Sequence, residues 1–232
     1  MSVLALPATD RFVDRVLQLL QRVDYRRADT PEEREAIFEL RYRAYLREGC
    51  IAPNFVRRFA DPVDDQDNTW IFGVYIDDIL ASSIRLTVNM PGVDDLPALH
   101  VFADVLAPEM KAGKTIIDPT RFVADRECSR RYPELPYVTL RLPWVALEYF
   151  QADYMLAAVR SEHQAFYKRL WGHQEICAPR PYPNLQKPIS LMTLDYRAAR
   201  DRVHQRYPFF RSTMFERRML LDRHQLARST AA

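Results

Sequence analysis

The sequence is poor in the residues that form disulfides and most structural metal sites. Only three of its 232 residues are cysteine, and Cys50, Cys128 and Cys177 lie far apart in the chain. An odd number of cysteines without a Cys-x-x-Cys pair argues against a disulfide framework and a zinc site. No His-Glu-x-x-His surrounds His163, and no glycine-containing EF-hand loop is present. We therefore expect no bound metal or cofactor, and a reducing, cytoplasmic environment.

Long apolar runs and a large excess of charge are also missing. No stretch of about 18 uncharged apolar residues occurs, which argues against a membrane span. The N-terminus lacks the basic region and apolar run of a signal peptide. Lysine and arginine total 33 against 31 aspartate and glutamate, so overall charge gives no reason to expect nucleic acid as a partner. Hydrophobic residues make up 48% of the chain, enough for a sizeable core.

Apolar periodicity and turn residues predict alternating helices and strands. Predicted helices cover residues 10–23, 31–47, 99–106, 138–150 and 162–171, and predicted strands cover residues 70–75, 80–88, 115–125, 154–159 and 189–194. Predicted loops are residues 50–69, 126–136 and 178–183, and the segment after residue 195 is predicted to be helical with an aromatic break at residues 207–210. This order predicts one α/β domain over residues 1–232, with a mixed sheet, a core at about residues 25–195 and helical extensions at both ends.

Two predicted helices begin with side-chain caps. Thr30 and Glu33 form a capping-box pattern around Pro31, and Ser161 with Gln164 repeats the pattern before a later helix.

The first predicted helix is amphipathic, with its apolar residues on one side (Phe12, Val13, Val16, Leu17, Leu19 and Leu20). A packed helix and a membrane-surface helix both fit this pattern, and the mixed charge of the polar face favours the packed helix. A weak contact with a membrane surface is the most that we expect.

An acidic segment separates the second helix from the first hairpin. Asp61, Asp64, Asp65 and Asp67 place four carboxylates within seven residues, and they repel one another unless a cation lies among them. That cation could be a metal, an arginine or a substrate ammonium group. A solvated acidic loop and a pocket rim that receives an amine both remain open.

The predicted strand at residues 115–125 is the one around which the other elements are arranged. Pro119 has no N–H for a regular ladder, so we predict a bulge or an edge at this position. A bulge would free a backbone N–H to point at a ligand. Asp118 and Arg121 lie close together in this strand, either as an ion pair or as groups that act on a substrate.

Several segments, in a fixed order, resemble GNAT-like acyltransferases, and within them the N-acyl amino acid synthases and the acyl-homoserine-lactone (autoinducer) synthases. They are residues 40–45 (Leu-Arg-Tyr-Arg-Ala-Tyr), the acidic segment with residues 67–70, the strand residues 83–86 (Ser-Ile-Arg-Leu), residues 118–122 (Asp-Pro-Thr-Arg-Phe) and residues 166–170 (Phe-Tyr-Lys-Arg-Leu). Asp118 stands where the family has glutamate. The resemblance implies a mostly antiparallel central sheet, flanked by helices, in which a donor thioester lies between two splayed strands.

Two departures from these families bear on the substrates. Residues 46–60 lack the tryptophan of homoserine-lactone synthases, and arginines follow Val123 where acetyl-CoA enzymes have a glycine-rich loop. The resemblance then implies transfer of a long-chain fatty acyl group from acyl carrier protein to the amine of an amino acid, with acyl-CoA less favoured as donor. The alternatives are a homoserine-lactone synthase that uses S-adenosylmethionine, an acetyl-CoA enzyme, and a non-catalytic domain that binds acylated carrier or lipid.

The same resemblance implies roles for individual residues. Asp118 is the expected general base and Tyr167 the expected acid for the leaving thiol, with an ion-paired aspartate and a core tyrosine as the structural alternatives. Because no Gly-x-Ser-x-Gly occurs, we expect direct attack by the amine. Substrate-binding candidates are Arg41, Tyr45, Asp64, Asp65, Arg85, Arg121 and Phe122, the arginines because a guanidinium pairs with a carboxylate. Candidates for docking an acidic carrier protein, or else an ordinary basic face, are Lys111, Lys114, Arg126, Arg130 and Arg131.

Overall fold

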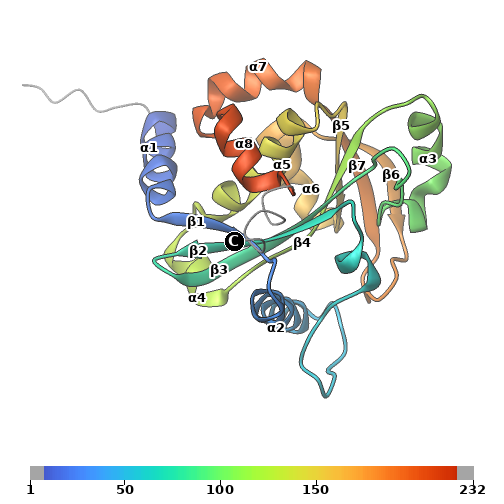
Figure 1. Cartoon of the computed structure of the whole chain (residues 1–232), viewed down its shortest axis with the longest axis horizontal. Helices are drawn as coiled ribbons and strands as arrows, with labels where there is room; N and C mark the ends of the chain where they lie inside the picture. Colours follow the sequence, from blue (N-terminus) through green and yellow to red (C-terminus); the bar gives the residue numbers. More distant parts are fainter. Residues whose placement is uncertain (1–7, 224–232) are drawn as a thin grey trace, which may run out of the picture.

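A seven-stranded sheet forms the centre of the molecule (Figure 1). The computed structural model describes residues 8–223, and the side chains of residues 11–223. The strands are β1 Val23–Arg27, β2 Thr69–Ile76, β3 Ile79–Val88, β4 Ile116–Ala124, β5 Tyr154–Val159, β6 Gln174–Arg180 and β7 Ile189–Asp195. Their order in the sheet is β1-β2-β3-β4-β5-β7-β6, and only the β4–β5 pair is parallel.

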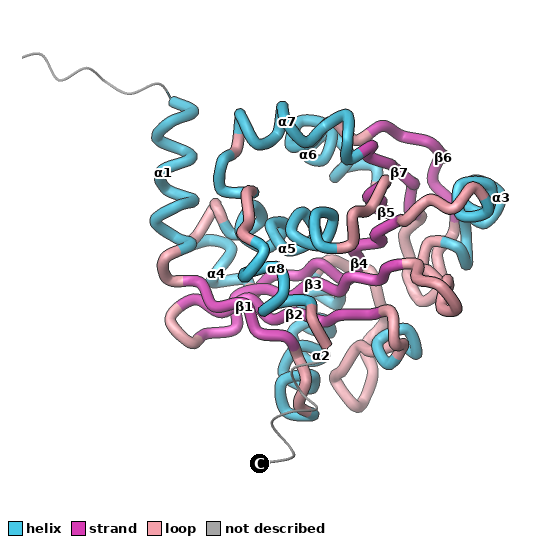
Figure 2. The backbone as a smooth tube through the Cα atoms, turned by 45° about the horizontal axis from the view of Figure 1, so that its top comes forward, coloured by secondary structure: helices cyan, strands magenta, loops and turns pink. Residues whose placement is uncertain are grey.

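Helices cover both faces of this sheet (Figure 2). The α-helices are α1 Ala8–Leu20, α2 Pro31–Arg47, α3 Leu99–Lys111, α4 Arg126–Arg131, α5 Leu135–Tyr149, α6 Ser161–Trp171, α7 Tyr196–Arg206 and α8 Met214–Leu221, and the 3-10 helices are η1 Pro62–Asp65 and η2 Pro208–Phe210. One face carries α1, α5, α7 and α8, whereas α2 packs on the other against β2, β3 and β4. The predicted mixed sheet flanked by helices is thus confirmed.

The main core lies between the sheet and α5. Eleven residues of α5 are buried, and Trp144 packs its ring 5.5 Å from that of Trp171 and 5.6 Å from that of Phe210. On the opposite face α2 begins with the predicted capping box, in which the Thr30 hydroxyl accepts from Glu33 N and the Glu33 carboxylate accepts from Thr30 N. A cap of this kind is worth about 1 kcal/mol and fixes where α2 starts.

The strands β4 and β5 separate soon after they meet. Their register contains only two pairs, Ile116 with Tyr154 and Ile117 with Met155, although both strands continue further. The pair is joined where both strands begin, so it opens toward their C-terminal ends at Ala124 and Val159. This is the splayed strand pair that the sequence resemblance implied. Pro119 lies just beyond the last pair, so its missing N–H interrupts no ladder with β5.

The predicted bulge is present but lies after Pro119. Ser83 pairs with Val123 and Arg85 with Thr120, so two residues of β4, Arg121 and Phe122, stand opposite one residue of β3. Arg121 has φ of 55°, in the left-handed region that residues other than glycine rarely adopt. Pro119 itself is in register with Leu86. The bulge was predicted at Pro119 and instead begins two residues later, at Arg121.

Several predicted boundaries were wrong. The segment predicted as a loop at residues 126–136 contains α4, because the Asp125 carboxylate accepts from Glu127 N and Cys128 N and starts a short helix. Strands β1 and β6 were missed. The first has only five residues, three of them charged, and the second is an edge strand paired with β7 through an irregular register, so neither has a clear apolar alternation.

Two helices differ in detail from the predictions, α6 in its N-cap and α1 in which of its apolar residues are buried. Arg160 rather than Ser161 is the N-cap of α6, and the Gln164 amide donates to the Ser190 hydroxyl at 2.9 Å instead of capping. In α1, Val16 and Leu19 are buried against the core, as expected for a packed helix, whereas Leu17 is exposed. Among the described residues, no helix has the length and apolar character needed to cross a bilayer.

Candidate functional site

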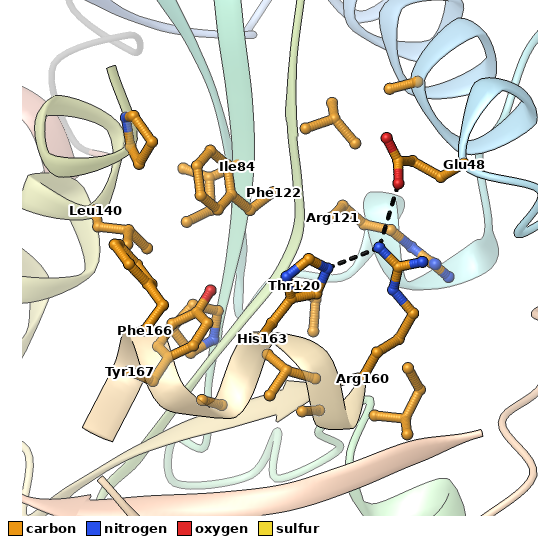
Figure 3. A pocket seen from close by; sticks show the side chains of 18 of the residues that line it. Glu48, Ile84, Thr120, Arg121, Phe122, Leu140, Arg160, His163, Phe166 and Tyr167 are labelled. Atoms are coloured by element: carbon orange, nitrogen blue, oxygen red, sulfur yellow. Dashed lines mark hydrogen bonds and ion pairs between the residues drawn. The ribbon is translucent and has the colours of Figure 1, made fainter. Parts of the chain in front are cut away.

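A cleft of about 510 Å³ lies where β4 and β5 diverge. Its walls are the splayed halves of the two strands, the C-terminal end of α2, and parts of α5 and α6. Apolar side chains line one part of it, namely Ile84, Phe122, Leu140, Leu156, Phe166 and Trp171 (Figure 3). Polar side chains line another part, namely Arg47, Glu48, Arg160 and His163. A volume of this size is in the range of small-molecule sites, and its apolar part suits a hydrocarbon group.

One helix contributes side chains along this cleft. His163, Phe166, Tyr167 and Trp171 recur at the three- and four-residue spacing that places side chains on one face of α6. His163 lies near an ion-paired group in which Arg160 contacts both the His163 ring at 2.7 Å and Glu48 at 3.3 Å (Figure 3). Arginine only donates, so the contacted ring nitrogen accepts and the imidazole is neutral. Partial burial, reinforced by Arg160, lowers the pKa of His163 and keeps it so.

The predicted acid Tyr167 faces the same cleft. Its ring packs edge-on against Phe166 at 5.3 Å and lies 6.5 Å from Trp171. Burial raises the pKa of Tyr167, and the nearby Tyr45 raises it further. The phenol therefore stays protonated at neutral pH and is available as a proton donor, which is the state that the predicted role needs.

Three buried arginines, the buried Asp64 and the partly buried Asp61 form a network behind the cleft. Arg41 Nη1 donates to both oxygens of Asp64 at 2.8 and 3.0 Å. Arg85 Nη1 bridges Asp61 at 2.6 Å and Asp64 at 3.1 Å. Arg121 donates to Asp61 from Nε at 3.1 Å and from Nη2 at 2.6 Å. With three cations against two carboxylates, the network has one positive charge in excess.

The pKa values of this network follow from burial and pairing. Burial lowers the pKa of Arg41 to about 10, although Asp64 opposes the shift. For Asp61 burial acts to raise the pKa, but Arg85 and Arg121 outweigh it and hold the value at about 2. Two nitrogens of Arg41, Nε and Nη2, are buried without a hydrogen-bond partner. Such donors suit an anionic group, because a buried unpaired N–H is costly.

A short turn directs the two aspartates into this network. Asp61 caps η1, with its carboxylate accepting from Val63 N, and Asp64 accepts in return from Asp61 N at 2.9 Å. Side chains three residues apart lie on the same side of a 3-10 helix, so Asp61 and Asp64 point inward together. Asp65 instead points outward to Arg34 and its side chain is 79% exposed. Asp64 and Asp65 were both predicted to bind substrate, but only Asp64 points into the network. Asp61, which was not predicted as a site residue, points into it together with Asp64.

The predicted base Asp118 is fully buried on the same sheet face as Arg85. Its Oδ2 accepts from Ala98 N at 2.8 Å, while its Oδ1 has no partner. Burial raises the pKa of Asp118 to about 6, although the Ala98 N–H and two arginines oppose the shift. It does not pair with Arg121, which binds Asp61 instead. Tyr182 lies near it, since the Asp118 charge adds to burial in raising the Tyr182 pKa.

Three predicted substrate residues line the cleft directly, namely Tyr45, Arg121 and Phe122. Tyr45 lies at the end of α2, its ring 5.0 Å from that of Phe59, and Arg121 lies over both rings. Phe122 is the second residue of the bulge and lies in the apolar part of the cleft (Figure 3). Arg41 and Arg85 are almost completely buried and reach the cleft only through Asp61, Asp64 and Arg121.

The five basic residues predicted to dock a carrier lie in two places. Lys111 and Lys114 precede β4, whereas Arg126, Arg130 and Arg131 belong to α4, which follows it. Nine strand residues separate the groups by roughly 30 Å, so they do not form one patch. Only the α4 group lies toward the open ends of β4 and β5. Lys114 contacts Asp153 at 3.3 Å at the closed end.

Sequence reasoning missed the polar residues of the cleft other than Tyr45, Arg121 and Tyr167. Glu48 lies at the end of α2, whereas Arg160 and His163 lie three residues apart at the start of α6, and no sequence pattern links the two segments. By contrast, the three-residue spacing of Asp61 and Asp64 around Pro62 was visible and would have identified the inward pair. Among residues 11–223, no group of three or more histidine, cysteine or carboxylate side chains is placed to hold a metal ion.

Comparisons with known proteins agree with this geometry. A family model described as N-acyl amino acid synthase FeeM matches residues 36–195. The solved structure of FeeM, an N-acyl amino acid synthase from uncultured soil microbes, gives a TM-score of 0.67 at 21% identity and covers 81% of this chain and 98% of that chain. TofI, solved with an inhibitor and MTA, gives 0.58 at 16% identity over 81% and 96%. An acyl-CoA N-acyltransferase from Pseudomonas aeruginosa gives 0.50 at 19% identity over 74% and 98%. No curated protein matches.

The structural likenesses are at low sequence identity, so they establish the GNAT-like fold and no more. The family match is different, because it extends from within α2 to the end of β7 and includes every strand that forms the cleft. The chain therefore belongs to the FeeM family of N-acyl amino acid synthases, and it is an acyltransferase.

Proposed function

We propose that the chain transfers a long-chain acyl group from the thioester of an acyl carrier protein to the amine of an amino acid. The single observation that supports this most is the apolar cleft between β4 and β5, which has Tyr167 on one wall and a cationic network behind another. An acyl chain fits the apolar part, and the thioester then lies near the residues that can act on it.

In this proposal the free edge of β4 holds the thioester arm of the donor. Beyond Ile117 the edge of β4 that faces β5 has no strand partner. A phosphopantetheine arm contains two amides, which can pair with such an edge as an added strand does. The bulge at Arg121 and Phe122 reorients the backbone beside this edge. A backbone N–H there is suited to stabilise the oxyanion that forms when the thioester carbonyl is attacked.

The acceptor is assigned to the side of Asp118 and Arg121. Asp118 is fully buried and does not line the cleft, so its unpartnered Oδ1 takes the proton of the amine through a bridging water. The acceptor carboxylate binds Arg121, the member of the guanidinium network that lines the cleft. Formation of the C–N bond makes the attacking nitrogen strongly acidic, so the Asp118 carboxylate, with a pKa of about 6, can accept its proton at neutral pH.

The reaction then balances without a covalent enzyme intermediate. The amine nitrogen attacks the thioester carbon, its proton passes to Asp118, which later releases it to solvent, and the C–S bond breaks. Tyr167 donates its proton to the departing thiolate and regains one from solvent. The products are an amide and the free thiol of the carrier.

The donor is assigned to a carrier protein because of the residues at the open end of the cleft. Arg126, Arg130 and Arg131 occupy α4 there, and the chain has no glycine-rich loop to wrap a nucleotide pyrophosphate. A basic helix suits an acidic carrier protein. The other two basic candidates, Lys111 and Lys114, are assigned no docking role because they lie at the closed end.

Turnover of the purified protein with matched donors tests this proposal. Acyl carrier protein and CoA carrying the same long-chain acyl group are each supplied with a mixture of amino acids, and products are identified by mass spectrometry. We expect an N-acyl amino acid, formed faster from the carrier. A higher kcat/KM with acyl-CoA would overturn the donor assignment. Formation of an acyl lactone on addition of S-adenosylmethionine, with no acyl amino acid, would assign the chain to the homoserine-lactone reaction instead.

A further inference from the structure

The turn that follows α2 exposes two apolar side chains at its tip. Phe55 is fully exposed and Val56 is 70% exposed. The segment after α2 extends away from the body of the molecule (Figure 1). Within residues 49–60 the only charged side chains are Arg57 and Arg58. The turn therefore combines an apolar tip with two cations, of which Arg58 also pairs with Glu35 of α2 at 3.2 Å.

Hydrogen bonds hold this tip in a defined conformation. Arg57 N donates to Asn54 O at 3.4 Å, and the Asn54 amide donates to Arg58 O at 3.0 Å. The turn is tied to α2, since Phe59 N donates to Phe38 O at 3.1 Å. Arg57 has φ of 51°, which a residue other than glycine adopts at a cost in free energy. An ordered turn thus keeps Phe55 and Val56 in water, which is unfavourable unless another surface covers them.

We propose that this turn, residues 53–58, inserts Phe55 and Val56 into the interface of an anionic lipid bilayer. Aromatic and aliphatic side chains enter the boundary between headgroups and acyl chains, and neighbouring cations are attracted to anionic headgroups. A protein partner fits less well, because a stable interface buries roughly 800 Å² on each side. Two side chains on a projecting turn offer much less area, whereas a bilayer needs no complementary pocket.

The turn begins beside the cleft, so a bilayer bound by the turn could receive the product of the reaction. Cys50, at the base of the turn, lines the cleft together with Tyr45 and Glu48. Its carbonyl also accepts from Gln186 N at 2.9 Å, so the turn and the segment before β7 meet beside the cleft. A bilayer bound at Phe55 therefore lies near the cleft, and an amphiphilic product could pass directly into it. This use rests on the proposed function, whereas lipid binding by the turn does not.

Two other apolar surfaces, on α1 and α8, are less suited to bring a bilayer to the cleft. The apolar face of α1 packs against the core through Val16 and Leu19. Helix α8 exposes Met214, Phe215 and Met219, but it lies on the opposite face of the sheet from α2 (Figure 2). Phe215 is 74% exposed and provides a matched control for the loss of an exposed phenylalanine.

Cosedimentation of the full chain with vesicles tests the proposal. We expect binding to vesicles of equal parts phosphatidylcholine and phosphatidylglycerol, weaker binding to pure phosphatidylcholine, and weakening by salt. Phe55→Ser is expected to lower partitioning about tenfold or more, because a buried phenylalanine contributes strongly to transfer from water. Arg57→Gly removes one charge at a position that favours glycine, and is expected to lower partitioning about fivefold. Phe215→Ser is expected to bind as the unmodified protein does.

A tryptophan at the tip gives a second and independent measurement. The three native tryptophans, Trp70, Trp144 and Trp171, are buried. A change in emission that is present only in Phe55→Trp therefore reports on the turn. We expect a shift to shorter wavelength on adding anionic vesicles, and quenching by brominated lipid.

Several results would overturn the proposal. They are absence of binding to anionic vesicles, unchanged binding by Phe55→Ser, and an equal loss with Phe215→Ser. Binding of an acyl carrier protein that Phe55→Ser abolishes, without vesicle binding, would assign the turn to a protein partner. With a soluble donor and no vesicles, Phe55→Ser is expected to turn over normally. Failure of the reaction and failure of lipid binding are thus separate results.

Discussion

At the scale of single residues, Asp118 is placed where it reduces stability. Burial raises its folded pKa to about 6, above the usual value of 3.8 for an aspartate. A carboxyl group with a raised folded pKa adds stability only below its unfolded pKa, and that contribution is lost as pH rises through about 6. At neutral pH the buried carboxylate therefore costs on the order of 2 kcal/mol, a cost that functional residues commonly impose.

Asp118→Asn is accordingly expected to inactivate the protein while stabilising it. The amide oxygen can still accept from Ala98 N, but it cannot take a proton from the amine. Urea unfolding at neutral pH should show a gain on the order of 2 kcal/mol that shrinks toward pH 4. In the unmodified protein, kcat should fall as pH drops through about 6. Full activity of the variant would contradict the role of Asp118 as a base.

The buried network gives the opposite expectation for Asp61. Asp61→Asn leaves Arg85 and Arg121 without their shared carboxylate, and breaking a buried pair costs about 3–5 kcal/mol. The Asp61 pKa is held at about 2, so its contribution is present above pH 4 and is lost as pH falls toward 2. Urea midpoints measured across this range should converge for variant and unmodified protein. Asp65→Asn, on an exposed carboxylate, is the control and should change stability by less than about 1 kcal/mol.

Removal of the Tyr167 hydroxyl is expected to lower kcat without changing donor binding. Tyr167→Phe keeps the ring contacts with Phe166 and Trp171 and removes only the hydroxyl. We predict a loss of about 100-fold in kcat with little change in donor KM, the usual size of a general-acid contribution. Tyr149→Phe, at the end of α5, removes a hydroxyl elsewhere and should have no effect. A Tyr167→Phe protein with normal kcat would leave the phenol a purely structural role.

At the scale of elements, prediction from the sequence depended on how local the physical cause was. The capping box of α2 has a local cause, so it was predicted. The exact site of the bulge was not, because the register between β3 and β4 decides which residues oppose each other. Strand β6 depends on β7 for its pairing, and its own sequence lacks the alternation that marks a strand.

The N-cap of helix α4 is expected to affect binding of the donor. Asp125 caps it by accepting from Glu127 N at 2.9 Å and Cys128 N at 3.0 Å. Asp125→Ala is expected to cost about 1 kcal/mol and to loosen the arginines of α4. We predict a higher KM for an acyl carrier protein but not for a small acyl thioester that lacks the carrier. Asp125→Asn retains a capping oxygen and should behave normally, and equal KM changes for both donors would contradict docking at α4.

At the scale of the whole molecule, the sheet consists of two parts that diverge around the cleft. Strands β1–β4 and β5–β7 share only two registered pairs, and α5 and α6 pack across the opening. The fold class and the cleft followed from the order of elements and motifs along the chain. The partners inside the site did not, because Asp61, Glu48 and Arg160 meet their partners only through the fold, over separations of 24 to 112 residues.

The most direct test of acyl transfer in this cleft is mass spectrometry of lipid extracts from cells that overproduce the protein, beside cells that overproduce Asp118→Ala. We predict an N-acyl amino acid that is present only with the unmodified protein, and its mass and fragments name the acyl chain and the acceptor. An acyl lactone instead, or the same acyl amino acid at equal amounts in both cultures, would contradict the account.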